Sequence, residues 1–362
     1  MSDSVTHGGS HDSQDKNFEA GDGKYQAEQI EEQPSYLDGG KRTTGQKIKR
    51  HCARFWWLHL VIFCIVFLII ALCLVYVAMP KIAQHGVDES SIEFTDIQFL
   101  SPTESSIVIT QQAILHSPSI YTPTLDPFNA SLYLVTDGVF ASTPMIVVEM
   151  PRIHALHPKS NASVDNQNVT IVDLDQVTKY ATTVLTNETV TTALTGRTDL
   201  HEGKLPVNKV NYNSSTTYLG LNGLKGFNVT GVIVNTSVAA GQPNLKGFAF
   251  IPNPSVLTVA MGNVTLSLST SAGVVGTSTV PDMTIRPGNN SLPMTAIVNQ
   301  TALITSLDKS GKVNMTITGT SSVYNGQHLT YYEKALSSNV LTLEMNVLQI
   351  LSDSAAAAAG LS

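Results

Sequence analysis

The sequence predicts a mostly β protein that has one transmembrane helix plus two tandem antiparallel β-sandwich domains, with a disordered N-terminal tail. Three observations support this fold class. Thr, Ser, Val, Leu and Asn crowd the region after residue 90, which favours strands and turns. An apolar run long enough to cross a bilayer precedes that region, and short segments within it repeat in one order. After the tail and the helix, roughly 280 residues remain, enough for two ordinary domains.

Residues 1–54 form the predicted cytosolic tail. They hold few large apolar side chains and many Gly, Ser, Gln, Asp and Glu residues, so they cannot bury enough surface to offset their ordering entropy. We expect this tail to be disordered and to be the end that binds a cytosolic partner, because Ser35 and Tyr36 lie in an acidic stretch there. The Ala-rich segment 351–362 is of low complexity and is also expected to be disordered.

The predicted transmembrane helix occupies residues 55–80. Between Leu58 and Met79 the only strongly polar residue is His59. Twenty-two helical residues span about 33 Å, which matches a bilayer core of about 30 Å. Pro80 is expected to stop the helix.

Charge on the two flanks predicts the orientation of this helix. After it come Lys81 and then two acidic residues, whereas six basic residues precede it: Lys41, Arg42, Lys47, Lys49, Arg50 and Arg54. The positive-inside rule then leaves the N-terminus in the cytosol and the C-terminus in the lumen or outside the cell, a type II signal anchor. Cys52, beside the basic cluster, is either a palmitoylation site or a plain juxtamembrane thiol.

Eleven Asn-x-Ser/Thr sequons support this orientation, because all of them follow the apolar helix. Oligosaccharides are attached to such motifs only on the luminal side. The acceptors are Asn129, Asn161, Asn168, Asn187, Asn213, Asn228, Asn235, Asn263, Asn289, Asn299 and Asn314.

Weak internal repetition predicts two copies of one β-sandwich, at 90–210 (the more divergent copy) and 218–350. Three blocks recur in order: 116–120, 129–134 and 187–194 answer 252–256, 263–268 and 299–306. Alternation with period two places Val264, Leu266 and Leu268 toward the interior and Asn263 toward solvent. Phe248 and Phe250 are also expected to point inward, and residues 174–194 to form a helix between strands.

Several segments resemble a fungal family of uncharacterised type II membrane proteins. They are Leu221 to Phe227, the strand that ends at Val234, Phe250 to Ser255, Met261 to Thr265, Gly276-Thr277 and Arg286 to Asn290. The domain of that family is related to the late-embryogenesis-abundant type-two, or water-stress, β-sandwich. The resemblance covers roughly 218–300 and implies a vacuolar-membrane protein with a short cytosolic tail, for which binding of a lipid or hydrophobic ligand has been proposed.

Composition and motifs argue against catalysis. The net charge of −7 comes without a basic cluster beyond the membrane flank, so nucleic acid is not an expected partner. Residues 203–281 contain no Asp, Glu, His, Cys or Arg, the side chains that acid–base, metal and thiol chemistry use. The pair His154 and His157 has no third ligand nearby and is better explained as a solvated loop than as a zinc site. We therefore expect no enzyme activity, no cofactor and no metal.

Asp173-Leu174-Asp175 is the strongest competing signal. Type II glycosyltransferases use such an Asp-x-Asp to hold a divalent metal against a nucleotide diphosphate, but Asp173 equally suits the N-cap of a helix. The sequence thus favours a single-pass vacuolar membrane glycoprotein whose luminal region serves scaffolding, signalling or hydrophobic-ligand binding. Such a transferase, in the Golgi or endoplasmic reticulum, and an adhesive glycoprotein of the plasma membrane are the alternatives.

Overall fold

The computed structural model describes residues 44–235, 237–239 and 241–358, with side chains from residue 54 onward. The rest of the predicted tail, 1–43, and residues 359–362 lie outside the described part. The chain divides into two units, 1–64 and 65–362.

The apolar helix is longer than predicted. It comprises α1 (Thr44–Cys73), a π-helical turn η1 (Leu74–Ala78) and α2 (Met79–Asp88), and its candidate membrane span is Arg54–Asp88. Residues 44–54, which the sequence assigned to the tail, belong to this helix, and the helix continues past the predicted stop at Pro80. The π-helical turn explains why: proline lacks an N–H and its ring collides with the carbonyl four residues earlier, and a wider turn just before it accommodates both defects.

The first half of the region beyond the helix, residues 91–219, holds eleven strands and one helix. They are β1 (Ser91–Leu100), β2 (Ser106–His116), β3 (Thr124–Leu125), β4 (Phe128–Thr136), β5 (Val139–Phe140), β6 (Ile146–Met150), β7 (Ile153–His154), β8 (Lys159–Asn161), β9 (Val164–Thr170), α3 (Leu174–Thr186), β10 (Thr189–His201) and β11 (Asn208–Leu219). Burial alternates strictly along β2, as expected for a strand with one buried and one half-buried face.

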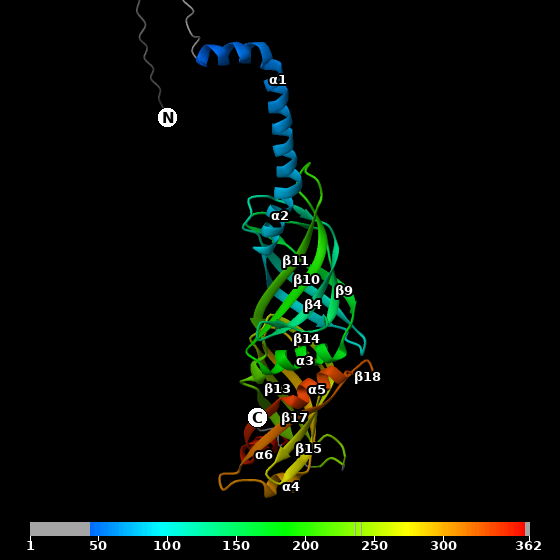
Figure 1. The fold of residues 1–362 in the computed structure, drawn as a ribbon. Helices are drawn as coiled ribbons and strands as arrows, with labels where there is room; N and C mark the ends of the chain where they lie inside the picture. The colour runs from blue at the N-terminus through cyan, green and yellow to red at the C-terminus, as the bar shows by residue number, and fades with distance from the viewer. Residues whose placement is uncertain (1–43, 236, 240, 359–362) are drawn as a thin grey trace, which may run out of the picture. The chain divides into compact units, whose positions relative to one another are not determined.

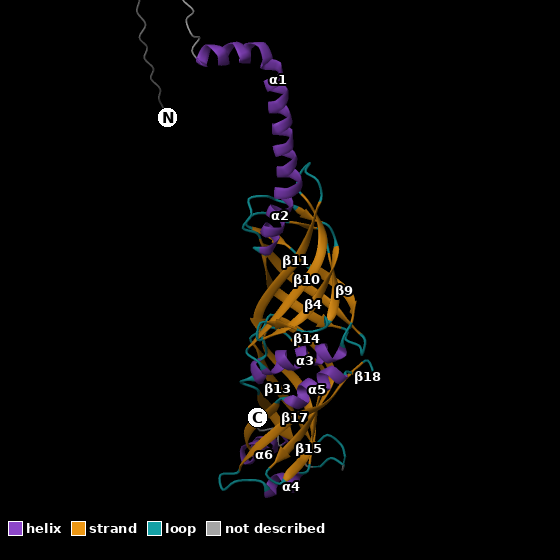
Figure 2. Cartoon of the chain, in the orientation of Figure 1, coloured by secondary structure: helices purple, strands orange, loops and turns teal. Residues whose placement is uncertain are grey.

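The second half, residues 222–358, follows without a long linker. Its elements are η2 (Asn222–Leu224), β12 (Asn228–Val234), β13 (Leu245–Asn253), β14 (Leu257–Thr270), β15 (Gly273–Ile285), β16 (Gly288–Val298), α4 (Gln300–Thr305), β17 (Lys312–Tyr324), β18 (Gln327–His328), α5 (Thr330–Ser338), β19 (Val340–Asn346) and α6 (Val347–Ala358). The mostly β prediction is confirmed (Figure 2).

Two sheets contain all these strands. In the first half a seven-stranded sheet built around β4 and β10 faces β1, β2, β8 and β9, and the Thr216 hydroxyl donates to the Ile92 carbonyl between the layers. The second sheet has twelve strands and runs through both halves, because β1 pairs in parallel with β14 at Ile97 opposite Leu257. Two separate tandem sandwiches are thus not confirmed.

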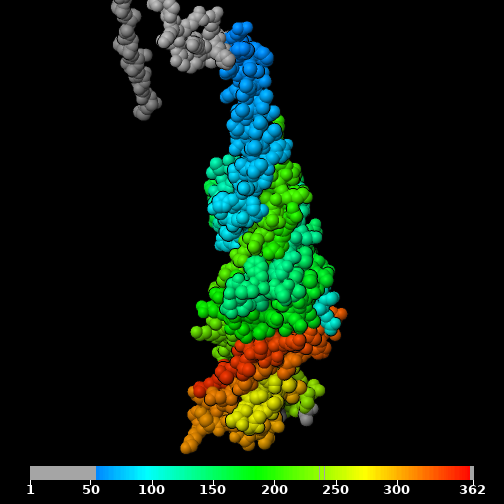
Figure 3. All heavy atoms as spheres, viewed as in Figure 1, coloured from blue at the N-terminus to red at the C-terminus, as the bar shows by residue number. Residues whose placement is uncertain are grey.

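Helices strengthen this junction between the halves. α3 packs against α5, and Figures 1 and 2 show the two helices side by side between the strand-rich regions. In Figure 3 the orange and red C-terminal residues form a band that separates green from yellow surface on this face. One cluster of buried side chains extends through both halves, from Val87 to Leu336.

Four further expectations differ from the structure. The helix predicted for 174–194 ends at Thr186, and the matched blocks 187–194 and 299–306 form a strand and a helix respectively. Phe248 is 47% exposed, because its neighbours Gly247 and Ala249 take the inner face of β13. Residues 351–358 are helical rather than disordered, since alanine has high helix propensity and α6 has a packed face.

Candidate functional site

The second half encloses an apolar cavity of about 230 Å³. The strands that line it include both β12 and β19, which are the two edges of this part of the sheet, so the sheet curls around the cavity. Sixteen residues surround it: Val229, Val234, Leu245, Leu268, Met294, Ala296, Val298, Gln300, Leu303, Ile304, Met315, Ile317, Met345, Val347, Ile350 and Leu351. Gln300 is the one polar side chain among these sixteen, so the cavity suits an apolar occupant.

α6 closes the gap between the two edge strands. Val347, Ile350 and Leu351 face the cavity, and the backbone N–H of Val234 on β12 donates to the Ser354 hydroxyl at 2.9 Å. The Ser354 hydroxyl also donates to the Ile350 carbonyl at 2.6 Å. It therefore accepts one hydrogen bond and donates another, both where α6 meets β12. α4 forms the other part of the wall.

Ile304 on α4 marks where the cavity nears the surface, because its side chain lines the cavity and is also 56% exposed. The wall contains no aromatic side chain but three methionines, Met294, Met315 and Met345. Methionine side chains are flexible and adapt to irregular apolar shapes. Sequence reasoning identified Leu268 as inward-facing, but it also placed Phe248 inward, so it gave no sign that the cavity wall lacks aromatic side chains.

All eleven predicted acceptor asparagines are exposed, and they lie on both halves. The ten other described asparagines behave differently: Asn208, Asn253 and Asn290 are buried, Asn222, Asn244 and Asn339 are half-buried, and Asn166, Asn211, Asn325 and Asn346 are exposed. Sequence motif and exposure thus agree more closely than the general surface preference of asparagine explains.

The hydrogen bonds of these side chains show the same division. Asn263 accepts from the Asp282 N–H and Asn299 from the Ala302 N–H, in both cases through Oδ1. Nδ2, the atom to which a glycan attaches, donates no hydrogen bond at any acceptor in the described part of the chain. In contrast, Nδ2 of Asn253 donates to the Leu257 carbonyl at 2.8 Å and that of Asn244 to the Val298 carbonyl at 2.7 Å.

Asp173 serves as the N-cap of α3. Its Oδ1 accepts from the N–H groups of Asp175 and Gln176 at 2.9 and 3.1 Å, and its Oδ2 accepts from the Thr143 hydroxyl. The Thr143 bond, followed by that of the Gln176 N–H, lowers the pKa of Asp173. Asp175 is exposed on the first turn. The capping interpretation of Asp173 is confirmed, and both its oxygens accept hydrogen bonds from the protein.

The two histidines of the predicted loop have separate partners. His154 Nδ1 lies 3.0 Å from the Thr124 hydroxyl, and His157 Nδ1 lies 3.0 Å from the Ser117 carbonyl. No group of three or more His, Cys, Asp or Glu side chains able to hold a metal occurs within the described residues.

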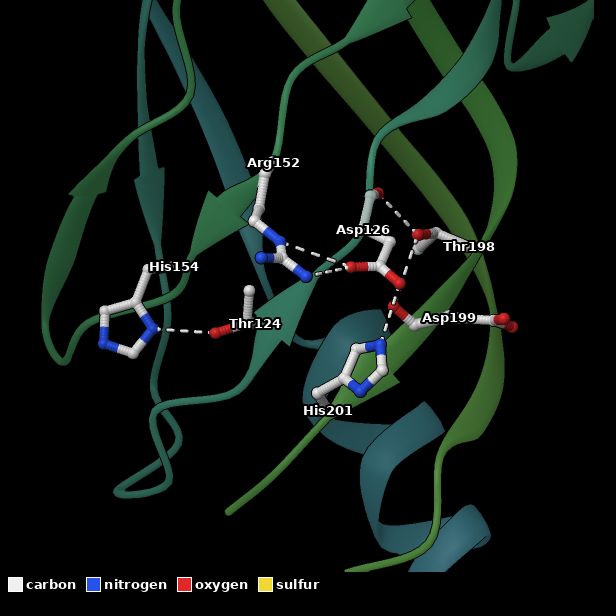
Figure 4. Close-up of polar contacts among 7 residues, drawn as sticks. All are labelled: Thr124, Asp126, Arg152, His154, Thr198, Asp199 and His201. Atoms are coloured by element: carbon white, nitrogen blue, oxygen red, sulfur yellow. Dashed lines mark hydrogen bonds and ion pairs between the residues drawn. The ribbon is translucent and has the colours of Figure 1, made fainter. Parts of the chain in front are cut away.

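A neighbouring polar cluster centres on Asp126, as Figure 4 shows. Oδ1 of Asp126 lies 2.7 Å from Arg152 Nη2, and Oδ2 lies 2.8 Å from His201 Nε2. The Thr198 hydroxyl donates to the backbone carbonyl of Asp126. The hydrogen bond of Arg152 and then that of His201 lower the pKa of Asp126. Because Thr198 and His201 belong to β10, these bonds tie the β3–β4 corner to that strand, and the Thr198 hydroxyl donates to a carbonyl rather than to a histidine. The Cys52 side chain lies outside the described residues.

Comparison with known proteins gives a family without a known function. Residues 143–268 match the family described as "Protein of unknown function (DUF3712)", a range that crosses from the first half into the second. No curated protein matches. A crystal structure of a protein from Archaeoglobus fulgidus is similar over 36% of this chain and 94% of its own, at 11% identity and a TM-score of 0.19. The periplasmic chaperone SfaE is similar over 66% of this chain and 95% of its own, at 12% identity and a TM-score of 0.13. The resemblance to a fungal vacuolar family stays a prediction.

Proposed function

We propose that this protein is a single-pass membrane glycoprotein whose outer, non-catalytic β region binds one apolar ligand, such as an acyl chain, in the cavity of the second half. The proposal is based on the apolar cavity in the second half. Engineered apolar cavities of about 150 Å³ stay dry and bind small apolar molecules, and this one is larger at about 230 Å³.

Energetics favour a ligand over a void. At about 24 cal/mol per Å³, an empty cavity of 230 Å³ costs on the order of 5 kcal/mol. Domains are stable by only about 5–15 kcal/mol in total. An apolar occupant would recover much of that cost, because it restores dispersion contacts to the wall and removes its own surface from water.

Anchoring and orientation rest on the apolar helix and the charges before it. Only one described helix is long and apolar enough to cross a membrane, and the sequons that follow it place exposed acceptor asparagines on both halves. We infer a cytosolic N-terminus and a luminal C-terminus, in the vacuolar membrane that the sequence resemblance implies. In sealed vesicles, cytosolic protease should remove a tag at residue 1, and glycosidase should shift the mass of the protected remainder.

Ligand binding can be tested by photolabelling. Membranes that contain the full chain are incubated with a fatty acid carrying a diazirine in its acyl chain, and irradiated peptides are mapped by mass spectrometry. We expect labelling of the β17 and β19 peptides that contain Met315 and Met345, and its loss in the cavity-filling double variant Ala296→Leu/Val298→Phe. Labelling of the apolar helix serves as the internal control. If the helix is labelled and these strands are not, the outer region has a structural role and ligand binding is rejected.

A further inference from the structure

The end of the first half next to α2 is fixed to the apolar helix. Gln84 on α2 donates from Nε2 to the Asn211 carbonyl at 2.8 Å, and its Oε1 accepts from the Asn211 N–H at 2.9 Å. The amide thereby pairs with the edge strand β11 as a neighbouring strand would. Val87 on the same helix is buried. Because α2 continues the apolar helix without a break, this attachment holds the adjoining loops close to the membrane that the helix is proposed to cross.

Two loops lie beside the helix at this end: residues 117–123, between β2 and β3, and residues 202–207, between β10 and β11. A small cavity of about 50 Å³ is lined jointly by Met79 and Ile82 of α2, by Tyr121 and by Glu202. In Figure 1 the green turn between β10 and β11 rises along the helix, beyond the α2 label. Both loops therefore lie beside the part of the helix where the apolar run ends, near Met79.

Burial along the helix agrees with this placement. Val75 is half-buried, whereas Val66 and Val77 on the same helix are exposed. One side of the helix is thus shielded before Met79, inside the segment that the sequence assigns to the bilayer. Because one helical residue rises about 1.5 Å, Val75 lies about 6 Å below Met79, a distance comparable to the thickness of a headgroup layer.

The tips of both loops carry exposed apolar side chains. Ile120 is 80% and Val207 50% exposed, and Tyr121 and Leu205 are also exposed. The segment 117–123 contains no charged residue. Aliphatic side chains beside a tyrosine are the composition that partitions into the membrane interface.

We propose that these two loops are a second membrane contact, in which Ile120, Tyr121, Leu205 and Val207 insert among the lipid headgroups of the bilayer that the helix crosses. The proposal rests on the proposed membrane anchoring. With this contact, the first half would lie on the membrane surface. The ligand cavity of the second half would then be held away from the membrane.

Depth-dependent fluorescence quenching tests this contact in the full chain reconstituted into phosphatidylcholine nanodiscs. In a background with Cys52→Ser, Cys64→Ala and Cys73→Ala, a single cysteine carries an environment-sensitive dye. Ile120→Cys and Val207→Cys report on the loops, and Val274→Cys is the matched control, since Val274 is an aliphatic residue 71% exposed at the start of β15. Ile69→Cys reports on the helix itself. We expect doxyl-labelled lipids to quench the dye at 120 and 207 several-fold more strongly than at 274.

Each outcome is decisive. Strong quenching at 69 with equal, weak quenching at 120, 207 and 274 overturns the second contact and leaves the anchor intact. Absent quenching at 69 rejects the anchor itself. A blue-shifted dye at 120 that lipids do not quench indicates a protein partner instead of the bilayer and also overturns the proposal. In the supporting case, Ile120→Asp should reduce the quenching at 207, because a carboxylate at the interface opposes insertion of both loops.

Discussion

The two halves of the outer region differ in how side chains fill the space enclosed by their sheets. In the first half two sheets face each other, and aromatic pairs pack in the core: Phe128 contacts Tyr212, Phe94 contacts Tyr218, and Phe99 contacts Tyr180 of α3, with each pair of ring centroids 5.9 Å apart. In the second half one curled sheet and two short helices surround a space that aliphatic and methionine side chains line but do not fill. Strand patterning is similar in both, so the difference lies in side-chain volume and in what closes the sheet.

Alternation of apolar and polar residues alone does not decide whether the space beside a β-sheet is filled. Two facing sheets stand about 10 Å apart, a gap that side chains from both faces close. A sheet that curls on itself encloses a wider space unless large residues occupy it. The second half lacks such residues on its inner wall, and its edges are covered by α6, which has small alanines beyond Ser354.

Adding volume to each half gives the largest expected contrast. Ala130 in the first half is fully buried, and Ala130→Leu should cost about 1–3 kcal/mol because the packed core must shift. Ala296→Leu adds the same atoms at the cavity wall and should change the free energy of unfolding by less than about 1 kcal/mol. Urea denaturation of the full chain in nanodiscs measures both. Equal costs would show that the cavity is not a usable space.

The junction between the halves offers the next test. Asn253 is buried, and besides its bond to Leu257 its Oδ1 accepts from the Ser255 N–H at 2.8 Å. Asn253→Ala should destabilise the protein by about 1–3 kcal/mol, since it leaves buried backbone groups without partners. Asn263→Gln is the surface control: it should leave stability nearly unchanged and remove one glycan-dependent step in gel mobility. A control without a mobility change would mean that this sequon is unoccupied.

Removing the N-cap of α3 should lower the free energy of unfolding by less than the Asn253 substitution does, because only one face of this helix packs against the junction between the halves. Asp173→Ala is expected to cost about 1 kcal/mol, whereas Asp175→Ala should stay within about 0.5 kcal/mol. Thermal unfolding followed by circular dichroism compares them. The same variants test the transferase alternative. If the protein binds manganese and a nucleotide sugar tightly and Asp173→Ala abolishes this binding, a glycosyltransferase is favoured over a non-catalytic ligand-binding protein.

The acid titration of Asp126, in the first half, should produce the smallest effect. The pKa of Asp126 is lowered in the folded protein from its ordinary value of 3.8. A carboxyl group with a depressed folded pKa stabilises the fold above its unfolded pKa, and this contribution is lost as the pH falls below that value. Asp126→Asn should therefore make stability less steeply dependent on pH below about 4 and leave the slope at pH 5–7 unchanged. An altered slope at pH 5–7 would contradict this assignment to the Asp126 carboxyl.

Local features of the chain were predictable from sequence, because they depend on residues that are neighbours along it. The apolar helix follows from one uninterrupted run, the exposure of Asn263 from alternation along a strand, and the cap of α3 from Asp173 at the start of an amphipathic segment. The folding of residues 351–358 as a helix was not predicted, because a short Ala-rich segment forms a helix only when another surface covers its apolar face.

Tertiary structure alone decided the rest. The pairing of β1 with β14 joins residues about 160 positions apart and merges two expected domains into one core; hydrogen bonds between distant strands leave no periodic trace in either segment. The cavity likewise depends on how far the sheet curls and on where α6 lies, while each wall residue taken singly is an ordinary inward-facing aliphatic side chain. Sequence determined which faces are apolar, and the long-range pairing of strands determined how much space those faces enclose.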